Sequence, residues 1–190
     1  MQRFKLIAAA VVAAASVTAA QAQSYYVGAS VGQSDYKIDT TGAANADTKD
    51  TGFKVFGGAM LTPNFGIEAA YFDLGKITGS GVEPGIGRVS LEGQASGIAL
   101  LGVAVLPLGE ASLFAKAGIA QVKGEIDART PLGNLRFDDT STQPMFGVGA
   151  SYAFTKNLGA RIEWERVRVR YSESLKDDTD LISAGVTYRF

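Results

Sequence analysis

The sequence after residue 24 consists of eight segments in which apolar and polar residues alternate, and the connections between these segments are alternately short and long. Successive side chains on a strand point to opposite faces, so alternation with period two predicts β-strands. We find no helix in this region with both an apolar stripe at helical spacing and a pair of caps. The predicted strands are 25–33, 51–61, 65–74, 93–106, 111–122, 142–154, 158–170 and 180–190.

The lengths of the connections predict how the strands are arranged. In an up-and-down antiparallel sheet, strictly alternating lengths place every short turn at one end and every long loop at the other. Outer-membrane β-barrels have short periplasmic turns and longer extracellular loops, and roughly 9–11 tilted residues are enough for a strand to cross the hydrocarbon. The short connections are 62–64, 107–110 and 155–157, and the long polar ones are 34–50, 75–92, 123–141 and 171–179.

The two faces of the predicted strands favour a barrel whose bulky side chains meet lipid. In 142–154, Phe146, Val148 and Tyr152 share one face, whereas Gly147 and Gly149 lie on the other. A soluble barrel would bury its large apolar side chains inside. A membrane barrel exposes them to lipid and fills its narrow lumen with small residues and a few charged ones. The almost continuously apolar strand 93–106 does not allow its faces to be assigned. We therefore predict an all-β fold, an eight-stranded antiparallel up-and-down transmembrane β-barrel.

Charged residues on the lumen side of the predicted barrel indicate a salt-bridge network. In strand 158–170, Ala160, Ile162 and Trp164 share the lipid face, so the charges between them face the lumen. Charges in a narrow lumen cost several kcal/mol each unless they are paired, and the two signs here are nearly balanced. The predicted network comprises Lys54, Glu68, Lys116, Arg161, Glu163, Glu165 and Arg189.

Three further arginines, Arg166, Arg168 and Arg170, continue on the face of Trp164. An arginine facing lipid at mid-depth would cost about 2–4 kcal/mol, so these residues are expected above the hydrocarbon, at headgroup level or higher. Guanidinium groups suit phosphate, so one hypothesis is a contact with lipopolysaccharide phosphates. The alternative is a solvated extension of the strand in which the arginines pair with acidic loop residues.

The N-terminal 22 residues have the pattern of a cleaved signal peptide. Arg3 and Lys5 precede an apolar run from Leu6 to about Ala15, and Ala20-Gln-Ala22 resembles a cleavage site. The run is shorter than the roughly 18 apolar residues of a membrane-spanning helix. We therefore expect a signal peptide at 1–22 and a barrel domain at 23–190, exported to the outer membrane of a Gram-negative bacterium.

Composition narrows the functions that remain. Without the signal peptide, 16 Lys and Arg face 19 Asp and Glu, a net charge of −3 that does not indicate a nucleic-acid partner. The chain has no cysteine, so disulfides do not stabilise it, and no histidine, which is the usual general base and metal ligand. We therefore expect no enzymatic activity, no catalytic residues, no cofactor and no metal site.

The chain resembles the small eight-stranded outer-membrane barrels related to the transmembrane domain of outer membrane protein A. The resemblance covers the whole region after the signal peptide, and its most specific feature is the C-terminal strand, which ends on an aromatic residue. In the family, such a terminus is an assembly signal read by the barrel-insertion machinery, and luminal ion pairs close the barrel. The matching terminal residues are Ile182, Ala184, Val186, Tyr188 and Phe190.

Two functions remain open after these steps. The first is a structural or surface-interaction (adhesin-like) protein of the outer membrane, a monomer whose partners are outer-membrane lipid, lipopolysaccharide and, during biogenesis, the assembly machinery. The second is a small passive pore that is gated by the luminal salt bridges. The longer family members carry a peptidoglycan-binding domain after the barrel, and this sequence ends with the barrel, so anchoring to the cell wall is not implied. The sequence does not name the partner of the extracellular loops.

Overall fold

The computed structural model describes residues 24–36, 45–47, 49–83, 87–130, 133–170 and 176–190. The predicted signal peptide at 1–22 therefore lies outside the described residues. None of the described residues belongs to a helix that is long and apolar enough to cross a membrane. The strands that these residues form are β1 (Ser24–Tyr36), β2 (Asn45–Asp47), β3 (Lys49–Met60), β4 (Phe65–Glu83), β5 (Gly87–Leu108), β6 (Ala111–Thr130), β7 (Gly133–Ala153), β8 (Leu158–Arg170) and β9 (Lys176–Arg189).

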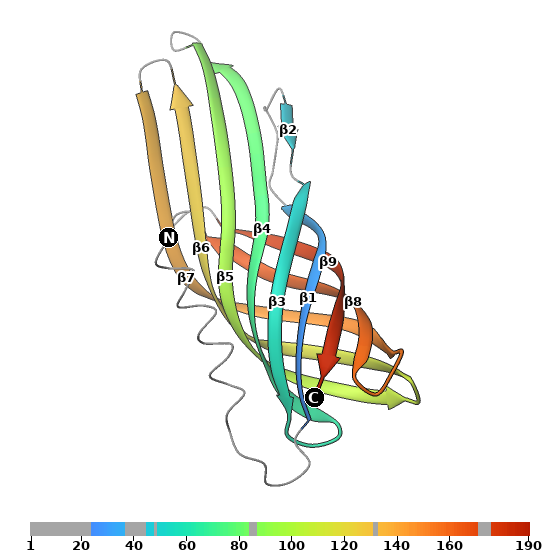
Figure 1. The fold of residues 1–190 in the computed structure, drawn as a ribbon. Coiled ribbons are helices and arrows are strands. Elements are labelled where there is room, and N and C mark those ends of the chain that lie inside the picture. The colour runs from blue at the N-terminus through green and yellow to red at the C-terminus, as the bar shows by residue number, and fades with distance from the viewer. Residues whose placement is uncertain (1–23, 37–44, 48, 84–86, 131–132, 171–175) are drawn as a thin grey trace.

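Eight of these strands close into an antiparallel barrel, as the sequence predicted (Figure 1). The order around the wall is β1-β3-β4-β5-β6-β7-β8-β9, and β9 pairs with β1 to complete the circle. The short β2 adds only Asn45–Asp47 to the edge of β4, opposite residues 78–80. Closure provides a partner strand on both sides of each of the eight strands, which a lipid-facing wall requires. We call the end with the tight connections the turn end and the opposite end the loop end.

The tight turn between β7 and β8 is stabilised by its own side chains. Thr155 Oγ1 accepts a hydrogen bond from the backbone N–H of Leu158 at 2.9 Å, and Asn157 Nδ2 donates to the backbone carbonyl of Arg189 at 2.7 Å. The turn at 62–64 also begins with threonine and ends with asparagine, and it makes the equivalent bonds at 2.9 and 3.0 Å. Because each asparagine holds the backbone of an adjacent strand, these turns help to set the strand register.

Four strands continue well past the rest at the loop end, where the sequence predicted loops (Figure 1). Much of the predicted loops 75–92 and 123–141 is therefore strand, because β4 pairs with β5, β5 with β6, and β6 with β7 along these residues. A strand shows period-two alternation in its sequence when one of its faces is buried. A hairpin that is held by backbone hydrogen bonds does not need such a sequence pattern. We call this extension the loop-end sheet; it consists of residues 77–83, 87–94, 124–130 and 133–144.

A β-bulge marks the point where β4 leaves the barrel wall. The register with β5 shifts between Asp73 and Lys76, and Gly75 between them has φ 73°, a conformation that glycine adopts without strain. The carboxylate of Asp50 accepts the backbone N–H of Lys76 at 2.6 Å and that of Thr51 at 2.7 Å. These two donors hold the pKa of Asp50 below its usual value.

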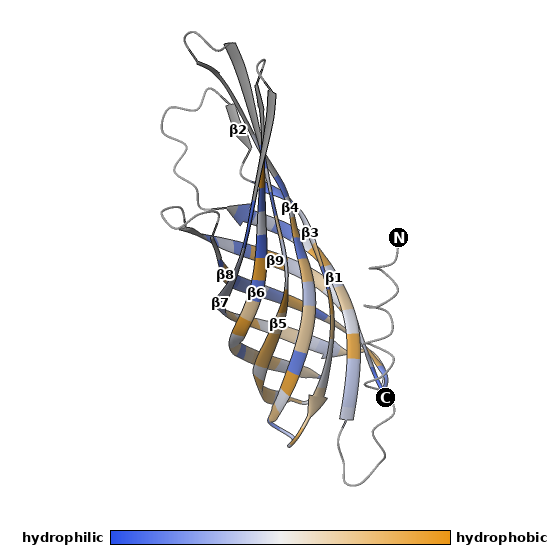
Figure 2. Cartoon of the chain, turned by 90° about the vertical axis from the view of Figure 1, so that its left-hand side faces the viewer, coloured by the Kyte–Doolittle hydropathy of each residue, from blue (hydrophilic) through white to orange (hydrophobic). Residues whose placement is uncertain are grey.

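The outer face of the barrel is apolar, as predicted. Val148, Ile162 and Ile182 are 52%, 63% and 65% exposed, values that large apolar side chains rarely reach together on a wall that faces water. In the strand whose faces the sequence did not assign, Ile98 and Leu100 point outward, whereas the odd-numbered residues from 95 to 103 are buried. Figure 2 shows apolar residues recurring along the strands of the barrel wall.

Aromatic pairs lie at both ends of this apolar face. Phe146 and Trp164 pack edge to face at the loop end, with ring centres 5.8 Å apart. Tyr188 and Phe190 form a similar pair at the turn end, with ring centres 5.2 Å apart. Transmembrane barrels carry aromatic girdles on either side of an apolar band about 25 Å tall. The outer face therefore has the two borders of a membrane-spanning segment.

Large apolar side chains also fill part of the lumen, where the sequence predicted only small residues and charges. Phe72, Leu74 and Val122 are 0%, 1% and 1% exposed. Glycines make room for them, since a Cβ on Gly97 would meet the ring of Phe72 at 2.8 Å. We call this cluster the apolar layer; its members are Phe72, Leu74, Ala95, Ala99, Leu101, Ala120, Val122, Met145, Val167 and Leu181.

Candidate functional site

Six of the seven charged residues predicted to share the lumen come together in one cluster. They project from β3, β4, β6 and β8, and all six are at most 6% exposed. β8 presents three of them at every second position, and β3, β4 and β6 present one each. We call this cluster the ionic layer; its members are Lys54, Glu68, Lys116, Arg161, Glu163 and Glu165.

Glu163 is the centre of the ionic layer because it contacts all three of its cations. One carboxylate oxygen, Oε1, pairs with Lys54 Nζ. The other, Oε2, lies 2.6 Å from Lys116 Nζ and 2.9 Å from Arg161 Nη2. Glu165 joins the two lysines from the neighbouring inward position, at 2.6 Å from Lys54 Nζ and 2.7 Å from Lys116 Nζ. Each lysine is therefore shared between carboxylates.

Arg161 and Glu68 complete the ionic layer on its turn side. Arg161 Nη1 donates to Glu68 Oε2 at 2.9 Å, and the hydroxyl of Tyr26 donates to the same oxygen at 3.0 Å. The guanidinium carbon of Arg161 lies 4.3 Å from the ring centre of Phe56 and 4.4 Å from that of Phe114. A guanidinium stacked between two aromatic faces gains cation–π attraction and loses freedom to move.

Charge balance explains how the ionic layer tolerates burial. Its three cations, Lys54, Lys116 and Arg161, face an equal number of carboxylates. A buried charge without a partner costs several kcal/mol, and one with good geometry recovers most of that cost. Because every member has at least two opposite charges or donors within contact, the layer holds together as a unit and depends on each of its members.

Arg189, the seventh predicted member, lies elsewhere, so its assignment to the network was wrong. Its side chain is exposed and borders a cavity at the turn end. The residue has the inward phase of β9, but it lies at the end of that strand on the turn side, opposite Tyr26 of β1. It therefore sits where the lumen opens, on the turn side of Arg161, and phase alone does not report this difference in depth.

We call Arg166, Arg168 and Arg170 the outer arginines, and the first two pair with aspartates of β9. Arg166 Nε and Nη2 donate to the carboxylate of Asp180 at 2.6 and 2.8 Å, and Arg168 Nε donates to Asp178 at 2.9 Å. These ion pairs agree with the alternative in which the arginines extend the strand and pair with acidic residues. Arg170 is opposite Lys176 in the strand register, and its side chain lies outside the described residues.

The ionic layer and the apolar layer are stacked along the barrel axis. On β8, Val167 of the apolar layer comes after Glu165 toward the loop end. On β4, Phe72 and Leu74 come after Glu68 in the same direction. The lumen is therefore filled first by paired charges and then, on the loop side, by packed hydrocarbon.

Three aromatic residues of the site, Tyr26, Phe56 and Phe114, were not identified from the sequence. Each shares the inward phase of its strand, and Phe56 and Phe114 stand two positions from Lys54 and Lys116. Continuing the period-two count from the two lysines would have placed both rings in the lumen. The two rings were not placed in the lumen because bulky apolar residues were expected to face lipid.

Comparison with known proteins gives the family. The model of the outer membrane protein beta-barrel domain matches residues 6–190. Outer membrane protein A of Shigella flexneri is 28% identical over 195 residues, which cover 97% of this chain and 55% of that protein. The chain thus spans about half the length of the curated relatives it matches.

Two crystal structures show the same fold at low sequence identity. Ail, the attachment invasion locus protein of Yersinia pestis, superposes with a TM-score of 0.59 at 15% identity, over 90% of this chain and 100% of that one. The neisserial surface protein A superposes with a TM-score of 0.57 at 16% identity and the same coverage. Fold and family model agree, and the chain belongs to the outer membrane protein beta-barrel domain family.

Proposed function

We propose that this protein is a non-conducting outer-membrane barrel with a structural and surface-interaction (adhesin-like) role. The observation that carries the proposal is the closure of the lumen by two stacked layers. Conduction would require water and ions to pass both the shared salt bridges around Glu163 and the fully buried side chains of Phe72 and Leu74. A barrel of eight strands has an interior only wide enough for its own side chains. With the lumen filled by these layers, the outer wall and the loop end are the surfaces that can interact with other molecules.

The loop-end sheet supports a surface role. It is a four-stranded extension in which residues 79–83 of β4 pair with 87–91 of β5, and β6 pairs with β7 as far as Thr130 and Gly133. Backbone pairing holds it at a defined position above the barrel, and a rigid element loses less entropy on binding than a free loop. Ail is named for attachment and has been crystallised with a heparin analogue, and we propose attachment to a sulfated polysaccharide as the first activity to test.

Trimming the loop-end sheet should abolish attachment and preserve the barrel. In the trimmed variant, Asn-Gly turns replace residues 80–90 and 125–138, since this dipeptide suits two-residue hairpins. Cells that display the trimmed protein should bind immobilised heparin no better than cells without the protein. Heat-modifiable migration on a denaturing gel serves as the folding control, and the substitution Lys156→Gln at the turn end is the matched control. Equal binding by the trimmed and unaltered proteins would contradict the proposal.

A small pore is the second candidate, and buried hydroxyls favour it. Among the described residues, the side-chain oxygens of Ser30, Ser183 and Thr187 are buried without a hydrogen-bond partner on the inner faces of β1 and β9. Buried polar groups of this kind are commonly satisfied by water. A chain of water along these strands would be the start of a conducting path beside the ionic layer.

Single-channel recording distinguishes the two candidates. We expect the refolded protein to leave a planar bilayer silent, and we expect Glu68→Ala to remain silent because the apolar layer is intact in that variant. Discrete current steps whose size or open time changes in Glu68→Ala would establish the gated pore instead. Migration of the unboiled protein as a compact band must first show that both samples are folded.

The outer arginines define the proposed contact with lipopolysaccharide. Guanidinium groups at headgroup level can bind phosphate in addition to the aspartates of β9. Reversing the charge of all three, with Arg166, Arg168 and Arg170 each changed to glutamate, should reduce the lipopolysaccharide that co-purifies with the monomeric barrel. If the amount of lipopolysaccharide stays the same, the arginines serve only the strand extension.

The predicted assembly signal is also retained as a proposal. The side chains of Ile182, Val186, Tyr188 and Phe190 are 65%, 57%, 47% and 68% exposed on the outer face, where another protein can reach them. Recognition by the assembly machinery predicts that deletion of Phe190 lowers the yield of barrel in the outer membrane more than it lowers refolding in vitro. Equal losses in both assays would assign Phe190 a purely structural role.

A further inference from the structure

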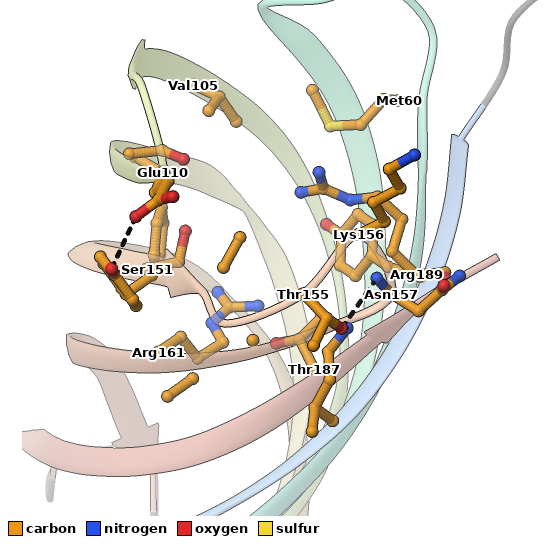
Figure 3. Close-up of a pocket in the computed structure, with 18 of the residues that line it drawn as sticks. Met60, Val105, Glu110, Ser151, Thr155, Lys156, Asn157, Arg161, Thr187 and Arg189 are labelled. Carbon is orange, nitrogen blue, oxygen red and sulfur yellow. Dashed lines mark hydrogen bonds between the residues drawn. The ribbon is translucent and has the colours of Figure 1, made fainter.

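The lumen opens at the turn end into a cavity that the ionic layer does not fill. Its volume is about 130 Å³, whereas a single buried water needs only about 10–15 Å³. Figure 3 shows Arg161 and Thr187 on its inner side and Lys156 and Arg189 near the turn between β7 and β8. The cavity is therefore large enough for a small polyatomic ligand with several waters.

Two buried donors belong to residues that line this cavity, and they have no hydrogen-bond partner among the described residues. They are Nε of Arg161 and Oγ1 of Thr187. Arg161 is only 6% exposed, and its other two nitrogens already donate to Glu68 and Glu163 at 2.9 Å. Leaving a buried N–H of a charged group unpaired costs free energy, and a ligand in the adjoining cavity is one source of the missing acceptor.

The charges at the cavity favour an anion as that acceptor. Lys156 and Arg189 line it in addition to Arg161, and among the described lining residues Glu110 is the only carboxylate. Glu110 accepts the hydroxyl of Tyr152 at 2.7 Å and keeps its negative charge, and Arg161 is already balanced by Glu68 and Glu163, so Lys156 and Arg189 give the cavity its excess of positive charge. The cations at the rim would attract an anion, and the buried guanidinium would bind it from within.

We propose that the turn-end cavity binds one small oxyanion through phosphate-type oxygens. One oxygen accepts Nε–H of Arg161, another accepts the hydroxyl of Thr187, and Lys156 and Arg189 neutralise the charge. Water alone would also satisfy the two buried donors, so the test compares added phosphate with a buffer that contains no phosphate. The oxyanion is either free inorganic phosphate or the phosphodiester of a lipid headgroup in the turn-side leaflet. The site does not depend on whether the lumen conducts or on what the loop-end sheet binds.

Nuclear magnetic resonance of the refolded barrel tests the site directly. The Nε–H signal of Arg161, assigned through its contacts with the rings of Phe56 and Phe114, should shift saturably when inorganic phosphate is added in detergent. Sodium chloride at equal ionic strength should not produce this shift. A second arm uses nanodiscs of phosphatidylglycerol or phosphatidylcholine without free phosphate. A shift in nanodiscs of either lipid without free phosphate identifies the phosphodiester of the headgroup as the source, whereas a shift only with inorganic phosphate identifies the free anion.

Variants outside the ionic layer keep the test independent of folding defects. The double variant Lys156→Gln with Arg189→Gln should weaken phosphate binding by about two- to five-fold, and Thr187→Val should weaken it by about two- to ten-fold. Lys76→Gln, which removes a cation at the loop end, is the matched control and should leave binding unchanged. The absence of a saturable shift in both arms, or equal affinities for all variants, would overturn the proposal.

Discussion

Replacement of Glu163 by alanine is expected to destabilise the folded barrel by about 3–5 kcal/mol, the range observed when one partner of a buried ion pair is removed. Glu163 contacts Lys54, Lys116 and Arg161, so its loss leaves three cations against two carboxylates in a part of the lumen that is almost free of solvent. The cations would have to draw in water or an anion, and either response requires the layer to rearrange.

Urea-dependent folding in lipid vesicles, followed by tryptophan fluorescence and gel mobility, measures this effect. Glu92→Ala is the matched control, because Glu92 pairs with Lys76 at 2.5 Å at the exposed loop end. The control should change the free energy of unfolding by less than about 1 kcal/mol. Removing charges of both signs, with Glu163→Gln and Lys54→Met together, should recover part of the loss. If Glu163→Ala and Glu92→Ala have equal effects, the ionic layer is solvated and does not close the lumen.

Replacement of Val148 by arginine should destabilise the protein in a bilayer by up to about 2–4 kcal/mol, the cost of a cation at mid-depth on the lipid face of a barrel. Val148 is 52% exposed on β7, opposite Trp164 on one side and Ala115 on the other. Lipid surrounds this position if the apolar wall spans the membrane. In water, an arginine at so exposed a position would have almost no effect.

Thr142→Arg provides the comparison on the same face of the same strand. Thr142 is exposed and lies beyond Met145, the last residue of β7 that pairs with β8. An arginine there should cost about 0–1 kcal/mol, because the cost falls toward the interface. Both variants should be measured by urea titration in the same vesicles. Equal costs for Val148→Arg and Thr142→Arg would contradict the position assigned to the membrane.

Period-two alternation predicted the barrel wall and most of the candidate site. It failed where the position of a residue depended on something other than its phase along the strand. It placed Lys54, Glu68 and Lys116 in the lumen because phase along a strand decides which face a residue occupies. It also placed Arg189 there, because phase carries no information about depth along the barrel. It missed the loop-end sheet, since strands held by backbone pairing alone need no buried face.

The sequence by itself determined the number of barrel strands, their antiparallel order, the two ends of the barrel and the apolar outer wall. These features follow from local rules, namely the alternation of side chains on a strand and the lengths of the connections. The tertiary structure alone decided which charges meet, since Glu163 on β8 reaches Lys54 on β3 and Lys116 on β6 only after the barrel has closed. It likewise decided that Phe72 packs over Gly97 inside the lumen. Contacts across a closed barrel depend on the register between every pair of neighbouring strands and on the depth of each residue along the barrel axis. No single segment of the sequence determines these together.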